Sequence, residues 1–438
     1  MQNAPQKKIL VVGAGFAGLS AAYWLGRHGH QVVIAERGAA LRDSGAQVDL
    51  RTPGVEIVER MGLLDAVEAR QVHEIGFEMI DEHGAVKSRM MANTSGTGTE
   101  SITAEYEIMR GDMLRLLHDA AKDRAEFRFD AKLERYEQDD EKVTAHFADG
   151  TTEDFDLLVG ADGQGSRIRK AILPAGAPDP YRRSGVHVAY WIVPRDNTDT
   201  DIATMYNAPG GRLLIRRSHS ADETQIYFFL RDDSPETRAI HRKPVDEQKR
   251  FWAGKLRGAG WQADRFLHAL ETSDNFYCHE VVQIVADRWH QGRVVLLGDA
   301  AHGLPPAGWG VTSSIVGSYI MTHELARTPD NPSVAFARYE AAMRPFIKSK
   351  EPASFASYRI LLPSTRLGIR LFHTLGQGAR TIMLGISKVR ARFSTATGRD
   401  SNRDRGTWTL PVYDDSPSPA GSSSMSSGEA RRGGPERQ

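Results

Sequence analysis

Three glycines near the N-terminus have a spacing that suits phosphate binding. Gly13, Gly15 and Gly18 follow a short apolar run and open a helical pattern. The first glycine permits a tight turn, the second lets a pyrophosphate approach the backbone, and the third lets helix and strand pack closely. The free N–H groups of the helix N-terminus then face the phosphates. Glu36 ends the next apolar run, about twenty residues on, where a carboxylate can accept hydrogen bonds from a ribose diol. The pattern predicts a dinucleotide site.

Two further motifs add groups of complementary chemistry. Asp162-Gly163 follows the apolar run that ends at residue 160, and Asp299 follows another that ends at residue 297. Carboxylates suit the hydroxyl-rich ribose and ribityl groups, and an arginine such as Arg110 suits phosphate. Glu36 would repel a 2′-phosphate, so the sequence favours FAD or NAD over NADP as the bound dinucleotide. The alternatives are structural: either aspartate could cap a helix, and Arg110 could be a solvated residue at a helix start.

The order and separation of these motifs resemble the class A flavoprotein monooxygenases, the group that includes para-hydroxybenzoate hydroxylase, over about residues 7–350. The resemblance implies noncovalent FAD, NADPH or NADH as hydride donor, and O2. It also implies a flavin C4a-hydroperoxide that hydroxylates or epoxidises an electron-rich substrate. The cofactor carries this chemistry, so neither a catalytic triad nor a metal is required.

The same resemblance implies which residues contact the cofactor. Glu36 would bind the adenosine ribose, Arg110 the region of the pyrophosphate, and Asp299 the ribityl chain. A helix that begins near Gly310 would direct its N–H groups at the flavin. The implied set of cofactor-binding residues is Gly13, Gly15, Gly18, Glu36, Arg37, Arg110, Asp162, Gly163, Asp299, Pro306, Gly308, Gly310 and Val311.

The segment from Gly45 to Arg51 resembles the corresponding loop of the tetracycline-inactivating monooxygenases and of relatives in polyketide pathways. This similarity implies a bulky aromatic, phenolic or enolic substrate from secondary metabolism or antibiotic modification. In that loop Gln47 either faces the flavin or makes an ordinary loop contact. In the helix after Gly310, Thr312 and Gly317-Ser318 stand where many members have Asn and Asp-Ala, which affects side-chain contacts and not backbone ones.

The elements that must position these residues form an α/β fold. Residues 8–12, 16–27 and 31–35 predict a strand, a helix and a strand, which start a parallel, Rossmann-like sheet. The pattern then changes to short strands separated by polar turns, which indicates a mostly antiparallel substrate domain inserted into the FAD-binding domain. We expect the FAD-binding domain at 1–182 and 291–350, the substrate domain at 183–290, C-terminal helices at 351–396 and a disordered tail at 397–438.

The middle domain offers side chains for a substrate, although core packing is the competing interpretation for each. Aromatic surfaces with a few polar anchors suit an aromatic ligand. With Gln47, the first candidates are His187, Tyr190 and Arg212, and the others are Trp191, Arg216, Tyr227 and Phe229. His302 could act as a base, but a local hydrogen bond is the favoured interpretation.

The composition of the chain limits the kinds of partner and the cellular compartment that we expect. Among 438 residues, 56 are Lys or Arg and 56 are Asp or Glu, which argues against nucleic acid as a partner. The lone cysteine, Cys278, fits a reducing compartment, and we expect a cytoplasmic protein. Contact of the C-terminal helices with a membrane surface is an alternative that we do not favour. Other chemistry on the same fold, in a halogenase or reductase, and a noncatalytic FAD-fold binding protein are the remaining alternatives.

Overall fold

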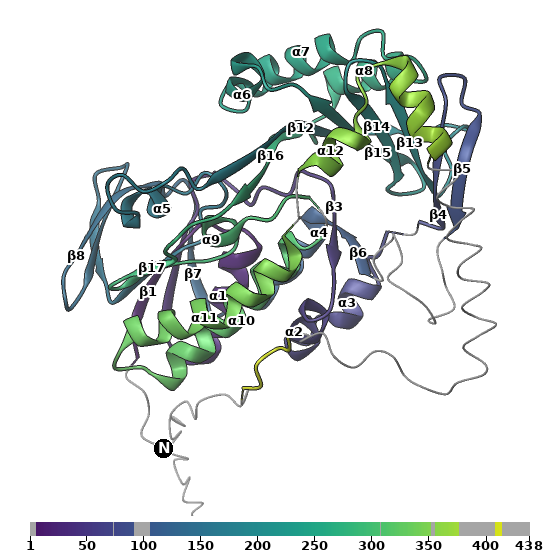
Figure 1. Ribbon diagram of the computed structural model, residues 1–438. Coiled ribbons are helices and arrows are strands. Elements are labelled where there is room, and N and C mark those ends of the chain that lie inside the picture. The colour runs from purple at the N-terminus through teal and green to yellow at the C-terminus, as the bar shows by residue number, and fades with distance from the viewer. Residues whose placement is uncertain are drawn as a thin grey trace, which may run out of the picture.

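The computed structural model describes residues 6–72, 74–91, 106–306, 308–351, 355–375 and 408–413. Two large sheets dominate the chain, and each is covered by its own helices (Figure 1). The strand–helix–strand start is confirmed: β1 (Lys8–Val12) and β2 (Gln31–Ala35) pair in parallel, and α1 (Phe16–Arg27) connects them. The predicted α/β fold, with a Rossmann-like domain interrupted by a mostly antiparallel sheet, is therefore correct.

The first sheet has six strands and is buried within the FAD-binding region. Its spatial order is β17 (His290–Gln291), β18 (Val294–Leu296), β11 (Leu157–Gly160), β1, β2 and β7 (Ala125–Arg128). All neighbouring pairs are parallel except β17 with β18. The strands that precede the three motifs, β1, β11 and β18, are therefore adjacent. Their carboxyl ends meet at one edge of the sheet, which is where ligands bind in such folds.

Helices from distant parts of the chain pack beside this sheet. Helix α1 packs against α4 (Arg110–Ala121) and α10 (Gly310–Arg327), and α10 packs against α11 (Pro332–Lys350). The shorter helices of this region are α2 (Gly54–Arg60), α3 (Leu64–Glu68), α5 (Arg167–Ile172) and α9 (Asp299–His302). Two small sheets complete it: β3 (Gln47–Leu50) with β6 (Tyr106–Met109), and β8 (Leu133–Gln138), β9 (Val143–Phe147) and β10 (Thr152–Phe155).

The second large sheet has seven strands and one helix-covered face. Its spatial order is β16 (Tyr277–Ile284), β12 (Tyr181–Pro194), β15 (Glu223–Arg231), β14 (Arg212–Ser218), β13 (Ile202–Ala208), β4 (Gly76–Ile80) and β5 (Val86–Met91). One face packs on α7 (Val245–Leu256) and α8 (Ala263–Thr272), which follow α6 (Pro235–Ile240). Two of its strands, β4 and β5, come from the range 1–182 that we expected to belong wholly to the FAD-binding part.

The C-terminal part of the chain returns to both regions. Helix α12 (Ala356–Leu361) is followed by a second helix at 366–375. Residues 408–413 then pack against α10 and α11, because Trp408 donates from Nε1 to the carbonyl of Ala342 at 2.8 Å and Tyr413 donates to Glu324 at 2.8 Å. The expectation of a tail disordered from residue 397 is therefore wrong for this segment. No helix in the described part of the chain has the length and apolarity needed to cross a membrane.

Candidate cofactor and substrate site

The glycine turn has the geometry that its spacing predicts. Gly13 has φ +105°, and a Cβ there would lie 2.5 Å from the carbonyl oxygen of Ala161. A Cβ on Gly18 would lie 2.0 Å from the carbonyl oxygen of Gly13, so the third glycine permits the close helix–strand contact. A Cβ on Gly15 would meet nothing within 4 Å, so this position opens toward the cavity in front of α1.

That cavity has a volume of about 810 Å³ and collects residues from all three motifs. Members of the predicted cofactor set that line it are Gly13, Gly15, Glu36, Arg37, Arg110, Asp162, Gly163 and Asp299. Gly18, Pro306, Gly308, Gly310 and Val311 are not part of its lining. Pockets that bind small molecules or cofactors commonly have volumes of about 300–1,000 Å³. The cavity is therefore large enough for a dinucleotide.

Glu36 is held in place by the backbone at the end of β2. One carboxylate oxygen accepts a hydrogen bond from the N–H of Ala14 at 2.9 Å, and the other accepts from the N–H of Gly38 at 2.9 Å. This fixed carboxylate joins the glycine turn to the loop after β2. It lies in the cavity wall, where its remaining lone pairs can accept hydrogen bonds from a diol.

Arg110 stands at the start of α4 and is partly buried. Its guanidinium lies 4.7 Å from the ring centroid of Phe16, and its Cδ lies 2.8 Å from where a Cβ of Gly45 would be. Its Nε is buried and has no hydrogen-bond partner among the described residues. Burial, together with the charge of Arg42, lowers the pKa of Arg110 to about 10. The side chain is still protonated at neutral pH, so it presents a cation with an unused donor to the cavity.

Asp299 lies across the cavity at the start of α9. Its side chain is exposed to the open cavity. Desolvation raises the pKa of its carboxyl group, and the positive charges of Arg110, Arg169 and Arg42 oppose that rise. The two carboxylate oxygens of Asp162 have different surroundings. One carboxylate oxygen accepts from the N–H of Arg167 at 2.8 Å and so caps α5, whereas the other is buried with no partner among the described residues.

Arg169 joins these two aspartate motifs and was not among the predicted site residues. It is fully buried and donates to the carbonyl oxygens of Gln164 at 2.6 Å and Ala300 at 2.9 Å. It also donates to the hydroxyl of Tyr181 at 2.9 Å. The sequence could have indicated Arg169, because this residue ends the same motif that contains Asp162. Its contact with Ala300, the residue after Asp299, can be seen only in the folded structure.

The loop before α10 packs tightly against β3. Helix α10 begins at Gly310, as expected. Gly308 has φ +79°, and a Cβ there would lie 2.1 Å from a carboxylate oxygen of Asp49, so only glycine fits. The hydroxyl of Tyr358 in α12 donates to the carbonyl oxygen of Pro306 at 3.3 Å. This loop therefore connects the cofactor region to the C-terminal segment.

The face of the seven-stranded sheet opposite α7 and α8 carries a cluster of tyrosines. The rings of Tyr190 and Tyr227 meet edge to face at 4.8 Å, and those of Tyr190 and Tyr277 stack at 6.3 Å. Tyr277 also lines the cofactor cavity, where the guanidinium of Arg42 lies 4.5 Å from its ring centroid. Tyr358 packs on the same cluster. Tyr277 thus connects the cluster to the cavity.

Two first-choice substrate candidates, His187 and Arg212, lie on the helix-covered face of the sheet. Side chains alternate along a strand, so His187 and Tyr190 of β12 point to opposite faces. His187 makes a 2.8 Å hydrogen bond between its Nδ1 and Nε2 of His241, beyond the end of α6. Arg212 donates to the carbonyl oxygens of Pro209, Lys255 and Arg257. Both side chains therefore contact the helix-covered side of the sheet and not the tyrosine cluster, and neither lines the cofactor cavity.

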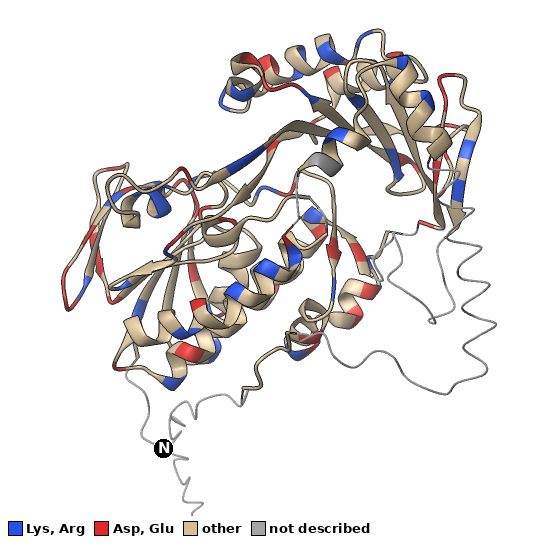
Figure 2. Cartoon of the chain, in the orientation of Figure 1, with Lys and Arg blue, Asp and Glu red and all other residues tan. Residues whose placement is uncertain are grey.

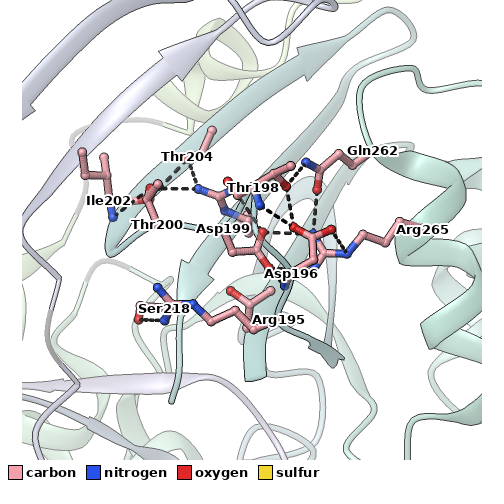
Figure 3. Close-up of polar contacts among 12 residues, drawn as sticks. Arg195, Asp196, Thr198, Asp199, Thr200, Ile202, Thr204, Ser218, Gln262 and Arg265 are labelled. Carbon is pink, nitrogen blue, oxygen red and sulfur yellow. Dashed lines mark hydrogen bonds and ion pairs between the residues drawn. The ribbon is translucent and has the colours of Figure 1, made fainter. Parts of the chain in front are cut away.

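Trp191 and Arg216 lie on the helix-covered face too. Trp191 donates from Nε1 to the carbonyl of Phe266 at 3.0 Å. Arg216 pairs with Asp199, which also accepts hydrogen bonds from Arg265 of α8 (Figure 3). The core-packing interpretation holds for these two residues. Of the other candidates, Tyr190, Tyr227 and Phe229 belong to or pack on the cluster beside the cavity.

Gln47 is part of a buried polar network behind the cluster. It accepts a 2.6 Å hydrogen bond from Gln225 and donates to Glu107, and it does not line the cofactor cavity. Arg217 completes this network through ion pairs with Glu74 and Glu107, and it lies 5.7 Å from the ring centroid of Tyr227. The predicted candidates on the same strand were Arg212 and Arg216. Strand alternation would have indicated Arg217 only if the face that carries the tyrosine cluster had been known to border the cavity.

His302 does not line the cavity either. Its Nε2 lies 3.4 Å from the hydroxyl of Tyr339 in α11, and its ring packs 4.8 Å from that of Trp289. Burial lowers the pKa of His302 to about 4. The favoured expectation of a local, structural hydrogen bond therefore agrees with its position, and the alternative role as a base does not.

The features of the cavity fit FAD. The Gly15 turn leaves room for a pyrophosphate, Arg110 keeps an unused donor and Asp162 an unused acceptor, and Asp299 faces the interior. Comparison with known proteins supports this identification. The sequence matches the family described as FAD binding domain over residues 6–348.

Individual relatives and solved structures agree with this family match. The chain is 33% identical over 392 residues to FAD-dependent monooxygenase asL4 of Sarocladium schorii, which covers 84% of this chain and 91% of that protein. It is 34% identical over 391 residues to flavin-dependent monooxygenase eupH of Phoma sp, covering 84% and 90%. The crystal structure of tetracycline destructase Tet(51) superposes with a TM-score of 0.75 at 26% identity, covering 93% of this chain and 100% of that one. The chain therefore belongs to the FAD-binding-domain family of class A flavin-dependent monooxygenases.

Proposed function

We propose that this monooxygenase uses NADPH or NADH and O2 to hydroxylate or epoxidise a bulky aromatic, phenolic or enolic small molecule in secondary metabolism or antibiotic modification. The observation that carries the proposal is the tyrosine cluster, which Tyr277 connects to the cofactor cavity. Flat aromatic walls favour stacking with an aromatic or polycyclic ligand. The similarity to tetracycline destructases supports a polycyclic substrate.

In this proposal the cavity residues hold the cofactor by complementary chemistry. Glu36 accepts hydrogen bonds from the adenosine ribose, Arg110 donates to the pyrophosphate region, and Asp299 accepts from the ribityl chain. The N-terminus of α10 presents its free N–H groups to the isoalloxazine edge. Bound FAD supplies the redox chemistry that takes hydride from the nicotinamide and activates O2.

The tyrosines in this proposal hold the substrate and exclude water. Burial raises the pKa of Tyr190 well above its usual value and the pKa of Tyr358 to about 12. Both hydroxyls therefore stay protonated near neutral pH and can donate hydrogen bonds to a phenolate or enolate oxygen. Holding that oxygen in its anionic form increases the electron density of the carbon that is to be attacked.

The proposal is tested by NADPH oxidation under isotopically labelled O2 with a panel of polycyclic phenols, each paired with its methyl ether. We expect a phenol to stimulate oxidation and to yield a product with one labelled oxygen atom. Tyr190→Phe should raise KM for that phenol roughly fivefold, because one hydrogen bond is lost. Tyr206→Phe is the matched control, since its hydroxyl donates to Ala259 on the helix-covered side. Hydrogen peroxide with no labelled product from any phenol would contradict the proposal.

A further inference from the structure

The helix that follows α12 exposes a stripe of leucines. In the helix at 366–375, Leu367, Leu371 and Leu375 are 76%, 57% and 63% exposed. They are spaced four residues apart, so they share one side of the helix. Ile369 and Phe372, on the other side, are partly buried. The helix thus uses one side to pack on the protein and presents a second apolar side to solvent.

Basic residues accompany this stripe. Arg366 and Arg370 are exposed on the same helix and have no ion-pair partner among the described residues. Ile360, in the preceding helix α12, is also apolar and 64% exposed. We name this surface the Leu–Arg face and define it by Ile360, Arg366, Leu367, Arg370, Leu371 and Leu375. The basic positions of this helix are blue in Figure 2.

The charge of the surrounding sequence has the same sign. Between Glu351 and Asp400 the sequence contains no Asp or Glu. It contains eight basic residues there: Arg359, Arg366, Arg370, Arg380, Lys388, Arg390, Arg392 and Arg399. Because the whole chain has 56 residues of each sign, the rest carries 48 basic and 56 acidic residues and a formal net charge of −8. Along the sequence, the positive charge is therefore concentrated in the stretch that contains the exposed leucines.

We propose that the Leu–Arg face binds the surface of an anionic lipid bilayer, the alternative that the sequence alone did not favour. Leucines on one side of a short helix, with arginines beside them, are the combination that places a helix in the interface of a membrane. Arginine stems lie along the acyl boundary while their guanidinium groups reach the lipid phosphates. Anionic headgroups complement the local charge, whereas the acidic remainder of the chain is repelled.

A second copy of the chain suits this face less well. A symmetric dimer places the same patch of both subunits in contact, so Arg366 and Arg370 would face their own counterparts. Charge therefore favours the bilayer.

The Leu–Arg face adjoins the substrate side. Helix α12 supplies Tyr358 to the tyrosine cluster, and Leu362, directly after it, is buried in the same cluster. A chain bound by this face would bring that cluster close to the membrane, where an apolar polycyclic substrate concentrates. This consequence rests on the proposed function, whereas the lipid binding itself does not.

Sedimentation of the full FAD-loaded chain with vesicles tests the proposal. We expect the chain to bind vesicles of phosphatidylcholine and phosphatidylglycerol, to bind vesicles of phosphatidylcholine alone much less, and to be released by salt. Leu367→Ser with Leu371→Ser should lower the partition coefficient roughly tenfold or more. The matched control replaces two exposed valines elsewhere, Val245→Ser with Val334→Ser, and should bind as the parent chain does.

A charge variant gives an independent measurement. Arg366→Gln with Arg370→Gln should lower binding to the anionic vesicles roughly tenfold and weaken its dependence on salt. Equal FAD content in all variants establishes that each is folded. The proposal is overturned if the parent chain does not sediment with anionic vesicles, or if the leucine variant binds as well as the valine control. It is also overturned if the chain forms dimers that the leucine variant dissociates, with no binding to vesicles.

Discussion

Asp299 and Arg110 both line the cofactor cavity, and the charge of each shifts the pKa of the other. Desolvation raises the pKa of Asp299, but the charge of Arg110 works against this and favours the carboxylate. The carboxylate is the form that accepts hydrogen bonds from a ribityl chain.

Replacing Asp299 should therefore remove the cofactor without unfolding the chain. We expect Asp299→Ala to give soluble protein that is purified colourless, because a charged hydrogen bond of about 1.5–3 kcal/mol is lost inside a desolvated site. The measurement is the ratio of visible flavin absorbance to protein absorbance. Asp274→Ala, in the loop before β16, serves as the control and should stay yellow. Stoichiometric FAD in the Asp299 variant would contradict the assigned contact.

At the scale of elements, a buried ion cluster connects α8 to the seven-stranded sheet. The side chain of Asp199 is fully buried, that of Arg216 is 4% exposed, and Arg265 of α8 completes the cluster (Figure 3). Arg216 also donates to the hydroxyl of Thr204 in β13 at 2.8 Å. The single carboxylate thus holds together the loop after β12, two strands and a helix.

Asp199→Asn should lower the free energy of unfolding by about 3 kcal/mol or more, because it leaves the buried guanidinium of Arg216 without its counter-charge. Urea denaturation followed by tryptophan fluorescence measures the change. Glu137→Gln breaks the exposed pair with Arg135 and should cost less than about 1 kcal/mol. If the two variants are equally stable, the cluster does not hold these elements together.

The contact between α9 and α11 predicts a dependence of stability on pH. Burial lowers the pKa of His302 from 6.5 to about 4, so between these values the unfolded chain binds a proton that the folded chain does not. The free energy of unfolding should therefore fall as the pH falls from 6.5 toward 4. His302→Gln should remove about 3 kcal/mol of this loss. Identical pH profiles for variant and parent, from urea titrations at each pH, would show that the pKa of His302 is the same in the folded and unfolded chains.

The sequence predicts the cofactor side of the site better than the substrate side. Gly13, Gly18 and Glu36 act through the local backbone of one strand–turn–helix–strand unit, so their spacing alone indicates their geometry. His187 and Tyr190 are three residues apart in one strand, and which of them faces the site depends on the face that α7 and α8 cover. Which face the helices cover is decided by tertiary contacts, so the sequence of the strand alone does not reveal it.

The same limit explains two residues that sequence analysis missed. Arg217 differs from Arg216 only in the face to which it points, and periodicity does not say which face is the site. Arg169 contacts the motif of Asp299 from a position 130 residues earlier in the chain. Both assignments need the order of the strands, because long-range contacts and not local patterns decide them.

At the scale of the whole molecule, the segment 408–413 anchors the C-terminal part of the chain to the FAD-binding region. Tyr413 is 9% exposed, and its ring lies 5.0 Å from that of His323 and 5.6 Å from that of Tyr319. The ring of Trp408 lies 4.7 Å from that of Phe346. The segment therefore covers the C-terminal half of α10, whose other end faces the cofactor region.

A chain that ends at Thr407 should melt about 3 °C or more below the full chain, because the apolar contacts of two aromatic side chains are lost. A chain that ends at Tyr413 is the control and should melt as the full chain does. Differential scanning fluorimetry of the three proteins measures this effect. Equal melting temperatures would mean that the docked segment adds nothing to stability.

The most direct test of the whole account is the visible absorption spectrum of the purified full-length chain. The account predicts the two absorption bands of oxidised flavin, and about one FAD per chain released on denaturation, because the cavity between the three motifs holds that cofactor. Anaerobic NADPH, with substrate where reduction requires it, should bleach the bands, and O2 should restore them. A colourless chain that takes up no added FAD would contradict the assignment of the cavity, and with it the proposed chemistry.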